Sequence, residues 1–195
     1  MSLDHLLLGT LREPASGYDV KARFDAVFRH FWPAEQSQIY RTLRRLEDQG
    51  LLSSRAAASE KGPDRRVYRT TTKGRDALRR WLRDGPQVKD DRHAFCAQTF
   101  FLDELGSDEE SLAFLRALRD EFAKRVAELR ATEHEWREAD PRYPDDLPVG
   151  ELTQQFTLAL GLAKYGAIVA WADDCIRRLQ ARPSQSGARR SGGKP

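Results

Sequence analysis

Cysteine is scarce in this 195-residue sequence. Only Cys96 and Cys175 occur; they lie far apart in apolar surroundings, and there is no CxxC pair or Cys/His cluster. The sequence therefore predicts neither a disulfide framework nor a zinc finger, since both need several closely spaced ligands. We expect two free, buried thiols in a reducing cytoplasm, with a redox switch as the alternative.

Long apolar runs and enzyme motifs are also lacking. No stretch is long enough to span a membrane, and the apolar N-terminal run lacks the basic flank and cleavage site of a secretory signal. No P-loop, GxGxxG or GxSxG motif occurs, and the four histidines show no metal-ligand spacing. We therefore expect a cytoplasmic protein without membrane contact, enzymatic activity, cofactor or metal.

Charge is unevenly distributed along the chain. Residues 1–85 hold 17 Lys/Arg against 11 Asp/Glu, whereas residues 86–182 hold 13 against 19. A basic first half suits a polyanionic partner, and an acidic second half suits solubility and self-association. This asymmetry indicates two regions with different roles.

Residues 34–52, AEQSQIYRTLRRLEDQGLL, predict an amphipathic helix over residues 35–49. Three residues at i, i+4 and i+7 form its apolar stripe: Ile39, Leu43 and Leu46. The opposite face is polar and basic, and no acid interrupts it over residues 36–46. Gly50 is typical of the left-handed residue that ends a helix. One face of this helix thus suits a small core, and the other suits an anionic partner.

The order of elements around this helix is that of a winged helix. Short helices are expected over residues 3–11 and 17–29, the second capped by Ser16. Two strands, 55–59 and 65–70, flank a turn rich in Gly, Pro and charged residues, and another helix follows from Lys73 to about Asp84. A helix-turn-helix followed by a β-hairpin is a winged helix, a fold that binds DNA.

The second half is expected to be almost entirely helical. Helices are predicted over residues 91–105, 107–139 and 149–180, the second of them capped by Ser107, with a stiff, proline-rich loop over 140–148. Four apolar residues recur every seven positions along the middle helix and form a seam that needs a partner: Leu115, Phe122, Leu129 and Trp136. The expected fold class is thus mostly α with a small β-hairpin wing. Its domains are a winged helix-turn-helix over residues 1–85, a helical dimerisation domain over 86–182 and a disordered basic tail over 183–195.

Several motifs resemble the PadR family of bacterial transcriptional regulators. They are Leu8, the run Ser16-Gly17-Tyr18-Asp19-Val20, the run Ile39-Tyr40-Arg41-Thr42-Leu43 with Leu46-Glu47, Gly50-Leu51, and Tyr68-Arg69-Thr70-Thr71 with Gly74-Arg75 and Leu78. The second half resembles the longer PadR subgroup, whose C-terminal domain is helical and virulence-activator-like. The wing departs at Thr70, where the family usually has an aliphatic residue.

The resemblance implies a homodimer, joined through the C-terminal helices, that binds a roughly palindromic operator in double-stranded DNA. Repressors are commoner than activators in the family. Binding is modulated by a small-molecule effector or by none, and the resemblance does not say which. Some relatives stack planar effectors between tryptophans, so Trp136 and Trp171 are candidates for a pocket; core packing is the alternative for both. Two recognition helices held apart by the seam should lie about 34 Å, one DNA turn, from each other.

The candidate DNA-binding residues come from the basic helix and from the predicted wing. Residues at the start and on the exposed face of a recognition helix meet base edges, and basic residues further along meet phosphates. The set is Gln36, Ser37, Gln38, Tyr40, Arg41, Thr42, Arg44 and Arg45 from the helix, with Lys61, Arg65 and Arg66 from the wing. For Tyr40 a half-buried core position is the alternative, and for the arginines a solvated face. A winged-helix module that binds an acidic protein, without sequence-specific DNA binding, is the alternative function; RNA binding is a weaker one.

Overall fold

The computed structural model describes residues 2–57, 65–88 and 92–182, and the chain divides into two compact units between residues 90 and 91. The predicted basic tail, residues 183–195, lies outside the described residues. Among the helices of the described ranges, none is both long and apolar enough to cross a membrane.

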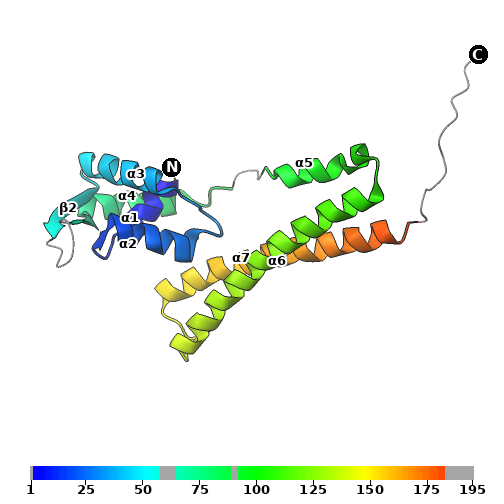
Figure 1. The fold of residues 1–195 in the computed structure, drawn as a ribbon. Helices are drawn as coiled ribbons and strands as arrows, with labels where there is room; N and C mark the ends of the chain where they lie inside the picture. The colour runs from blue at the N-terminus through cyan, green and yellow to red at the C-terminus, as the bar shows by residue number, and fades with distance from the viewer. Residues whose placement is uncertain (1, 58–64, 89–91, 183–195) are drawn as a thin grey trace, which may run out of the picture. The chain divides into compact units, whose positions relative to one another are not determined.

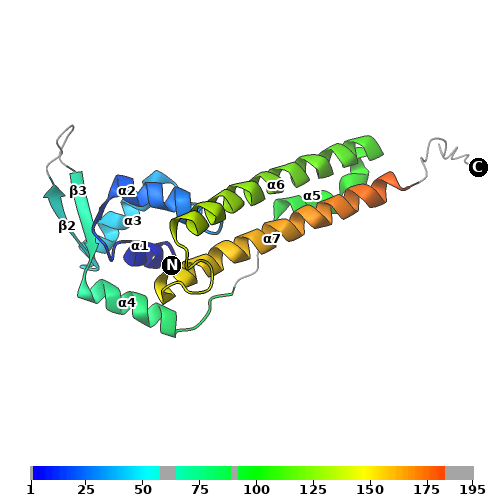
Figure 2. The same ribbon diagram turned by 90° about the horizontal axis from the view of Figure 1, so that it is seen from below.

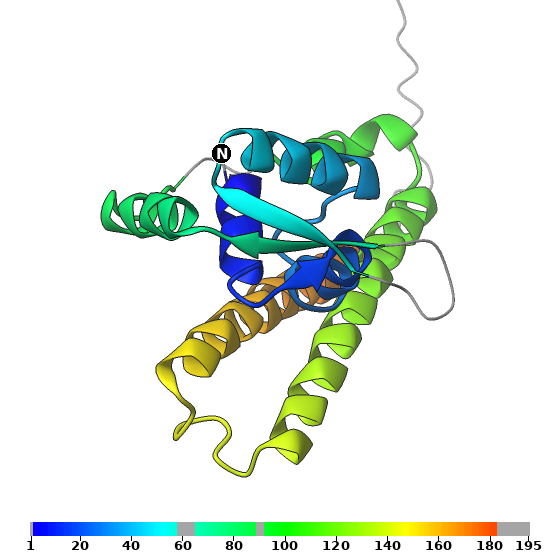
Figure 3. The same cartoon turned by 90° about the vertical axis from the view of Figure 1, so that its left-hand side faces the viewer.

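The first unit has the helix and strand order of a winged helix (Figures 2 and 3). Its elements are α1 (Ser2–Thr10), β1 (Ala15–Ser16), α2 (Gly17–Arg23) with the single π-helical turn η1 (Phe24–Phe28), α3 (Gln36–Asp48), β2 (Leu52–Ala57), β3 (Arg65–Thr70) and α4 (Thr72–Arg83). The predicted mostly helical fold with a β-hairpin wing is confirmed. The hairpin's first strand begins at Leu52, earlier than predicted, and the predicted turn between the strands lies outside the described residues.

The three strands form one antiparallel sheet in the order β1-β3-β2. β2 and β3 pair from Leu52 opposite Thr70 to Ala57 opposite Arg65, and the two-residue β1 adds Ala15 opposite Tyr68. The strand β1 was not predicted from the sequence. Its role is to lead into α2, whose first turn is closed by a capping box between Ser16 and Asp19.

One apolar core holds the first unit together. Side chains from α1, α2, α3 and the sheet are almost completely buried there: Leu7, Leu8, Leu11, Val20, Phe24, Ile39, Leu43, Leu46, Leu52 and Tyr68. The three residues of the predicted stripe on α3 are thus all in the core. On α4, Leu82 lies outside this core and is 64% exposed. The N-cap of α4 is Thr71, whose hydroxyl accepts from Gly74 N, and Thr72 is the first helical residue.

The second unit is built on two long helices that pack against each other and cross in the view of Figure 1. Its elements are α5 (Ala94–Phe100), the 3-10 turn η2 (Leu102–Leu105), α6 (Asp108–Ala139) and α7 (Val149–Gln180). Ser107 caps α6, as predicted, by accepting from Glu110 N. The helix predicted over residues 91–105 is interrupted at Phe101, which is 60% exposed.

The seam of α6 is covered by α7 of the same chain. Phe122 and Leu129 form a cluster with Leu158 and Tyr165, and Trp136 packs at its edge. The partner that this seam was predicted to need is therefore α7 of the same chain. The physical reason is that the proline-rich loop folds α7 back on α6, so an intrachain partner buries the apolar stripe.

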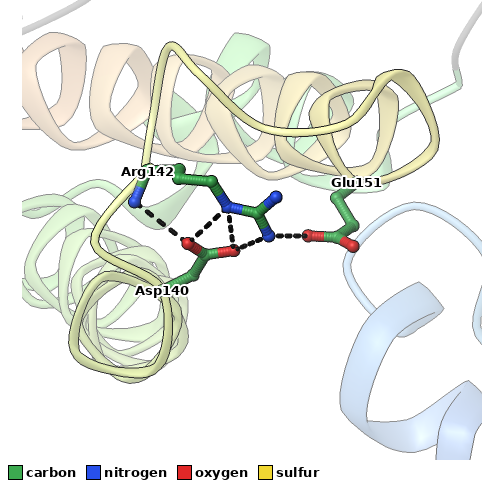
Figure 4. Close-up of polar contacts among 3 residues, drawn as sticks. All are labelled: Asp140, Arg142 and Glu151. Carbon is green, nitrogen blue, oxygen red and sulfur yellow. Dashed lines mark hydrogen bonds and ion pairs between the residues drawn. The ribbon is translucent and has the colours of Figure 1, made fainter.

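An ion-pair cluster fixes the loop between α6 and α7 (Figure 4). The Arg142 guanidinium donates to both carboxylate oxygens of Asp140, through Nε at 2.9 Å and Nη2 at 2.6 Å, and Arg142 N donates to Oδ1 at 3.0 Å. Glu151 Oε2 lies 3.9 Å from Nη2. These hydrogen bonds lower the pKa of Asp140 to about 2.

Candidate nucleic-acid interface

The N-terminus of α3 is closed by a reciprocal contact between Glu35 and Gln38. Glu35 N donates to the Gln38 amide oxygen at 3.2 Å, and the Glu35 carboxylate accepts from Gln38 N in turn. An N-cap pair of this kind satisfies backbone donors that would otherwise lack partners. Gln36 and Ser37 lie in the same first turn and are exposed. The first turn therefore presents exposed polar side chains next to a capped helix start.

Two arginines on the exposed face of α3 are uncommitted. Arg41 and Arg44 are both exposed, and neither guanidinium forms a hydrogen bond or ion pair within the described ranges. Because Ile39 and Leu43 on the opposite face are 0% exposed, the helix cannot rotate to bury its basic side. The core thus holds these two guanidiniums outward.

Two other residues that were predicted on this exposed face are placed differently. Thr42 is only 8% exposed, and its hydroxyl donates to the Gln38 carbonyl at 2.8 Å. The prediction that Thr42 faces outward was wrong because it lies at the edge of the buried stripe. Arg45 is half-buried, and its Nη2 pairs with Asp4 Oδ1 of α1 at 2.5 Å. Arg45 therefore ties α3 to α1 rather than extending freely.

Tyr40 is half-buried against the start of α2. A Cβ added at Gly17 would lie 2.5 Å from Tyr40 Cε1 and 3.0 Å from the Tyr40 hydroxyl oxygen. Only glycine leaves enough room there for the ring. This contact fixes the ring of Tyr40 at the junction of α2 and α3.

The two described arginines of the predicted wing tip point in different directions. Strand alternation places Arg65 and Arg66 on opposite faces of β3. Arg66 turns toward α3 and bonds to Glu47 and Ser54, while Arg65 lies close enough to Asp19 to help lower its pKa. Lys61, the third predicted wing residue, lies outside the described residues.

The outer face of the sheet carries basic residues that were not among the predicted DNA-binding residues. A hollow of about 320 Å³ is lined by Pro14, Ser53, Ser54, Arg55, Val67 and Arg69. Arg55 lies opposite Val67, and Arg69 lies opposite Ser53, so both arginines lie on one face of the hairpin. The alternation of strand residues was the signal that could have found them.

Burial and neighbouring charges shift two pKa values in this unit. Burial raises the pKa of Tyr68, and this effect outweighs the opposing influence of the nearby Arg66 guanidinium. The pKa of Asp19 is lowered, chiefly because its carboxylate accepts from the Ser16 hydroxyl at 2.7 Å and from Ser16 N at 3.1 Å. A capping carboxylate that stays ionised favours the start of a helix.

The two tryptophans proposed for an effector pocket do not share a site within one chain. Trp171 lies 6.5 Å from Phe95, ring to ring, and Phe95 lies 5.5 Å from Phe122. Trp136 lies about 21 Å further along α6 than Phe122, at a rise of about 1.5 Å per residue. A different hollow, of about 450 Å³, is lined by Ala97, Gln98, Phe101, Leu102, Leu105 and Phe114.

The cysteines differ from the prediction that both are buried. Cys96 on the short α5 is exposed, and Cys175 on α7 is half-buried. Both are free thiols. The described ranges contain no group of three or more His, Cys, Asp or Glu that could hold a metal ion.

Both units match known families. Residues 7–80 match the transcriptional regulator PadR-like family, and residues 92–180 match the virulence activator alpha C-terminal family. The negative transcriptional regulator PadR of Bacillus subtilis is 32% identical over 129 residues, which are 65% of this chain and 69% of that protein. The chain belongs to the PadR family of transcriptional regulators. The resemblance inferred from its motifs is thereby confirmed.

A further relative matches along most of this chain. A probable transcriptional regulator of Mycobacterium tuberculosis is 29% identical over 192 residues, which are 93% of this chain and all of that protein. These relatives are regulators and not enzymes, and this chain is likewise a transcriptional regulator and not an enzyme.

Solved structures of B. subtilis PadR and of a virulence activator share the fold. B. subtilis PadR in complex with operator DNA has a TM-score of 0.80 at 23% identity, covering 92% of this chain and 99% of that one. The Vibrio cholerae virulence activator AphA has a TM-score of 0.70 at 30% identity, covering 92% and 98%. A structure of B. subtilis PadR with p-coumaric acid has a TM-score of 0.74 at 23% identity, covering 92% and 96%.

Proposed function

We propose that this PadR-family regulator is a homodimer that binds a palindromic operator sequence-specifically and represses transcription in the cytoplasm. The observation that carries the proposal is the exposed face of α3, where Arg41 and Arg44 project without partners in the described part of the chain. An α-helix fits the major groove of B-DNA. The negatively charged phosphates on either side of the groove attract an exposed basic face on such a helix.

The exposed residues of α3 divide into two kinds of contact. Gln36, Ser37 and Gln38 lie in the first turn, where a recognition helix meets base edges. A glutamine side chain can pair with adenine, and Gln36 is the candidate for this contact because the amide oxygen of Gln38 already accepts from Glu35 N. Arg41, one turn further on, has the fork that pairs with guanine. Arg44 lies nearer the C-terminal end and is assigned to a phosphate. Arg45 and Thr42 leave the predicted set of direct contacts, because their side chains are committed inside the unit.

A second apolar face on α7 supports the homodimer. Phe156 and Leu160 are 56% and 67% exposed, and Val149 and Trp171 are exposed as well. These positions are separated by 7, 4 and 11 residues, close to whole turns of a 3.6-residue helix, so they share one side of α7. The buried Leu158, Tyr165 and Ala172 lie on the other side. An exposed apolar stripe of this length is typical of a protein–protein interface. A second copy of the chain would supply the second recognition helix that the two half-sites of a palindromic operator require.

Repression and an effector are proposed by analogy with relatives. B. subtilis PadR is a negative regulator, and one of its solved structures contains p-coumaric acid. A planar aromatic acid is therefore the first effector class to test. Because Trp136 and Trp171 lie apart within one protomer, a pocket that uses both would need residues from a second copy.

The test is a mobility shift on the DNA upstream of the protein's own gene, followed by selection from random duplexes. Arg41→Ala should weaken specific binding by about 1–3 kcal/mol if Arg41 pairs with a base. Arg80→Ala, which removes the same charge from an exposed position on α4, is the matched control and should change Kd little. Charge reversal of Arg41 and Arg44 together should abolish the shift.

Two outcomes would overturn the proposal. One is unchanged binding by the charge-reversed double variant. The other is selection that returns no palindrome, which would favour the docking of α3 on an acidic protein instead. Specific binding should also fall steeply with salt, since each neutralised phosphate contributes about −0.9 to the log–log slope.

A further inference from the structure

A three-residue network joins the wing to the recognition helix. Arg66 Nε donates to Ser54 Oγ at 2.6 Å, and Arg66 Nη2 donates to Glu47 Oε1 at 3.0 Å. The Ser54 hydroxyl accepts the first bond and donates its own proton to the same Glu47 oxygen at 2.6 Å. Each donor thus has an acceptor, and the three side chains, named the wing clamp below, close a ring of hydrogen bonds.

The wing clamp spans three elements. Glu47 is in the last turn of α3, Ser54 is in β2, and Arg66 is in β3. Tyr68, two residues beyond Arg66 on the same strand face, has its ring centroid 5.8 Å from the Arg66 guanidinium carbon. The chain between α3 and β2 turns through Gly50, at φ +70. Leu52 and Tyr68 anchor the base of the hairpin in the core, and the clamp adds a side-chain attachment to α3 nearer the wing tip.

The exposure of the Arg66–Glu47 ion pair indicates that the clamp orients the wing rather than stabilises the fold. The side chain of Arg66 is 57% exposed and that of Glu47 is 22% exposed. An ion pair this open contributes little to folding stability because water screens it. The fork of an arginine, however, fixes direction when its nitrogens bond to two different partners, as here.

We propose that the wing clamp is a positioning device for DNA binding, in which Glu47 and Arg66 set the angle between wing and recognition helix. Arg66 then acts through Glu47 and is not a phosphate contact, contrary to its selection as a direct DNA-binding residue from the sequence. The inference rests on the proposed function, since it concerns how the same surface meets its operator.

The clamp and its alternative predict opposite signs for one substitution. If Glu47 is merely an acid close to DNA, Glu47→Ala removes repulsion and tightens binding. If Glu47 holds the wing, the same substitution weakens operator binding by about three- to thirtyfold, the coupling expected within one network. Asp48→Ala is the matched control: it removes an exposed acid from the neighbouring position on α3 and should leave binding unchanged or tighter.

Arg66→Lys separates positioning from direct phosphate contact. Lysine keeps the charge but cannot reproduce the two-partner fork. Under the proposal, Arg66→Lys weakens binding as much as Arg66→Ala, and neither changes the salt slope. A direct phosphate contact would instead give near-normal binding with Lys and a slope reduced by about 0.9 with Ala. The Glu47→Ala/Arg66→Ala double variant should bind no worse than either single variant.

A DNA-free measurement distinguishes failure of the clamp from failure of the proposed function. Hydrogen exchange of the β2 and β3 amides in the free protein should speed up in Glu47→Ala and stay unchanged in Asp48→Ala. Unchanged exchange in Glu47→Ala overturns the clamp, even if the wild-type protein binds no DNA. Tighter operator binding by Glu47→Ala, or rescue by Arg66→Lys, overturns it where DNA is bound.

Discussion

The ring of Tyr40 occupies the space that a side chain at Gly17 would fill. A Cβ at Gly17 would meet Tyr40 Cε1 at 2.5 Å and Cζ at 2.8 Å, both far inside van der Waals contact. Gly17 is the first residue of α2 and is buried, so this close approach sets how α2 packs on α3. The Ser16-Gly17-Tyr18 motif thus has a steric meaning: it makes room for an aromatic residue of the recognition helix.

Gly17→Ala should displace the Tyr40 ring and destabilise the protein by about 1–3 kcal/mol, as overpacking generally does. Gly9→Ala is the matched control, because a Cβ there would lie 3.8 Å from Leu78, an ordinary contact, and alanine favours the helix. Thermal unfolding should show a lower Tm for the first variant and an equal or higher Tm for the second. In a Tyr40→Ala background Gly17→Ala should cost almost nothing; an undiminished cost there would refute the steric account.

The hydroxyl of Thr70 caps the C-terminal end of α1. Thr70 is 2% exposed, its Oγ1 donates to Leu8 O at 2.8 Å, and its backbone N donates to Leu11 O at 2.8 Å. The last carbonyls of a helix lack intrahelical donors, so a strand residue that supplies them joins sheet to helix. This contact explains why a polar residue is accommodated where an aliphatic one is usual in the family.

Thr70→Val keeps the shape of the side chain and removes the donor. Leu8 O would then be buried without this partner, and the substitution should cost about 1–3 kcal/mol. Thr72→Val, two residues away on the exposed start of α4, should change stability by less than about 0.5 kcal/mol. Urea unfolding of the two variants measures the difference, and equal midpoints would show that the Thr70 hydroxyl contributes nothing.

Local patterns in the sequence predicted most of the helices. Residues within one or two helical turns were enough to predict three features. These are the apolar stripe of Ile39, Leu43 and Leu46, the Ser107 cap, and the start of α7 after a proline. Such features depend on helical periodicity and capping chemistry, which act over a few residues.

The errors arose where distant segments decide the outcome. Arg45 and Arg66 looked like free cations, but their partners Asp4 and Glu47 are 41 and 19 residues away in sequence. The apolar seam of α6 was expected to hold two copies of the chain in position. The sequence alone does not show whether such a stripe packs against a second copy or against α7 of the same chain. An apolar stripe predicts that a partner exists, but only the three-dimensional fold identifies it.

The capping box at α2 should make the first unit sensitive to acid. Hydrogen bonds from Ser16 lower the pKa of Asp19 below its ordinary value of 3.8. A lowered folded-state pKa stabilises the protein above the unfolded pKa, and this contribution is lost as pH falls through the folded value. The stability difference between wild type and Asp19→Asn should therefore be full near neutral pH and shrink below about pH 4.

Ser16→Ala provides the companion measurement. It removes the hydroxyl donor that contributes most to the lowered pKa of Asp19. Chemical unfolding of the three proteins between neutral pH and about pH 2 should show a smaller acid dependence for both variants than for wild type. A wild-type and Asp19→Asn difference that stayed constant across this range would contradict the assignment.

Leu160 is the most direct probe of the proposed dimer. It is 67% exposed in the middle of the apolar stripe on α7, so Leu160→Glu should leave the α6–α7 hairpin intact in a monomer. In an interface related by a two-fold axis each copy would bring one carboxylate to the contact, and burying an unpaired charge is costly. We therefore expect Leu160→Glu to dissociate the dimer while the helical circular dichroism signal is unchanged.

Sedimentation velocity at low micromolar concentration measures this prediction. Ala127→Glu, which adds the same charge at an exposed position on α6, is the control and should remain dimeric. The monomeric variant should also lose preference for a palindrome over a single half-site, because two linked recognition helices bind with higher avidity than one. A dimer that survives Leu160→Glu would exclude the α7 stripe and direct attention to the exposed Phe100 and Phe101 of the α5 segment.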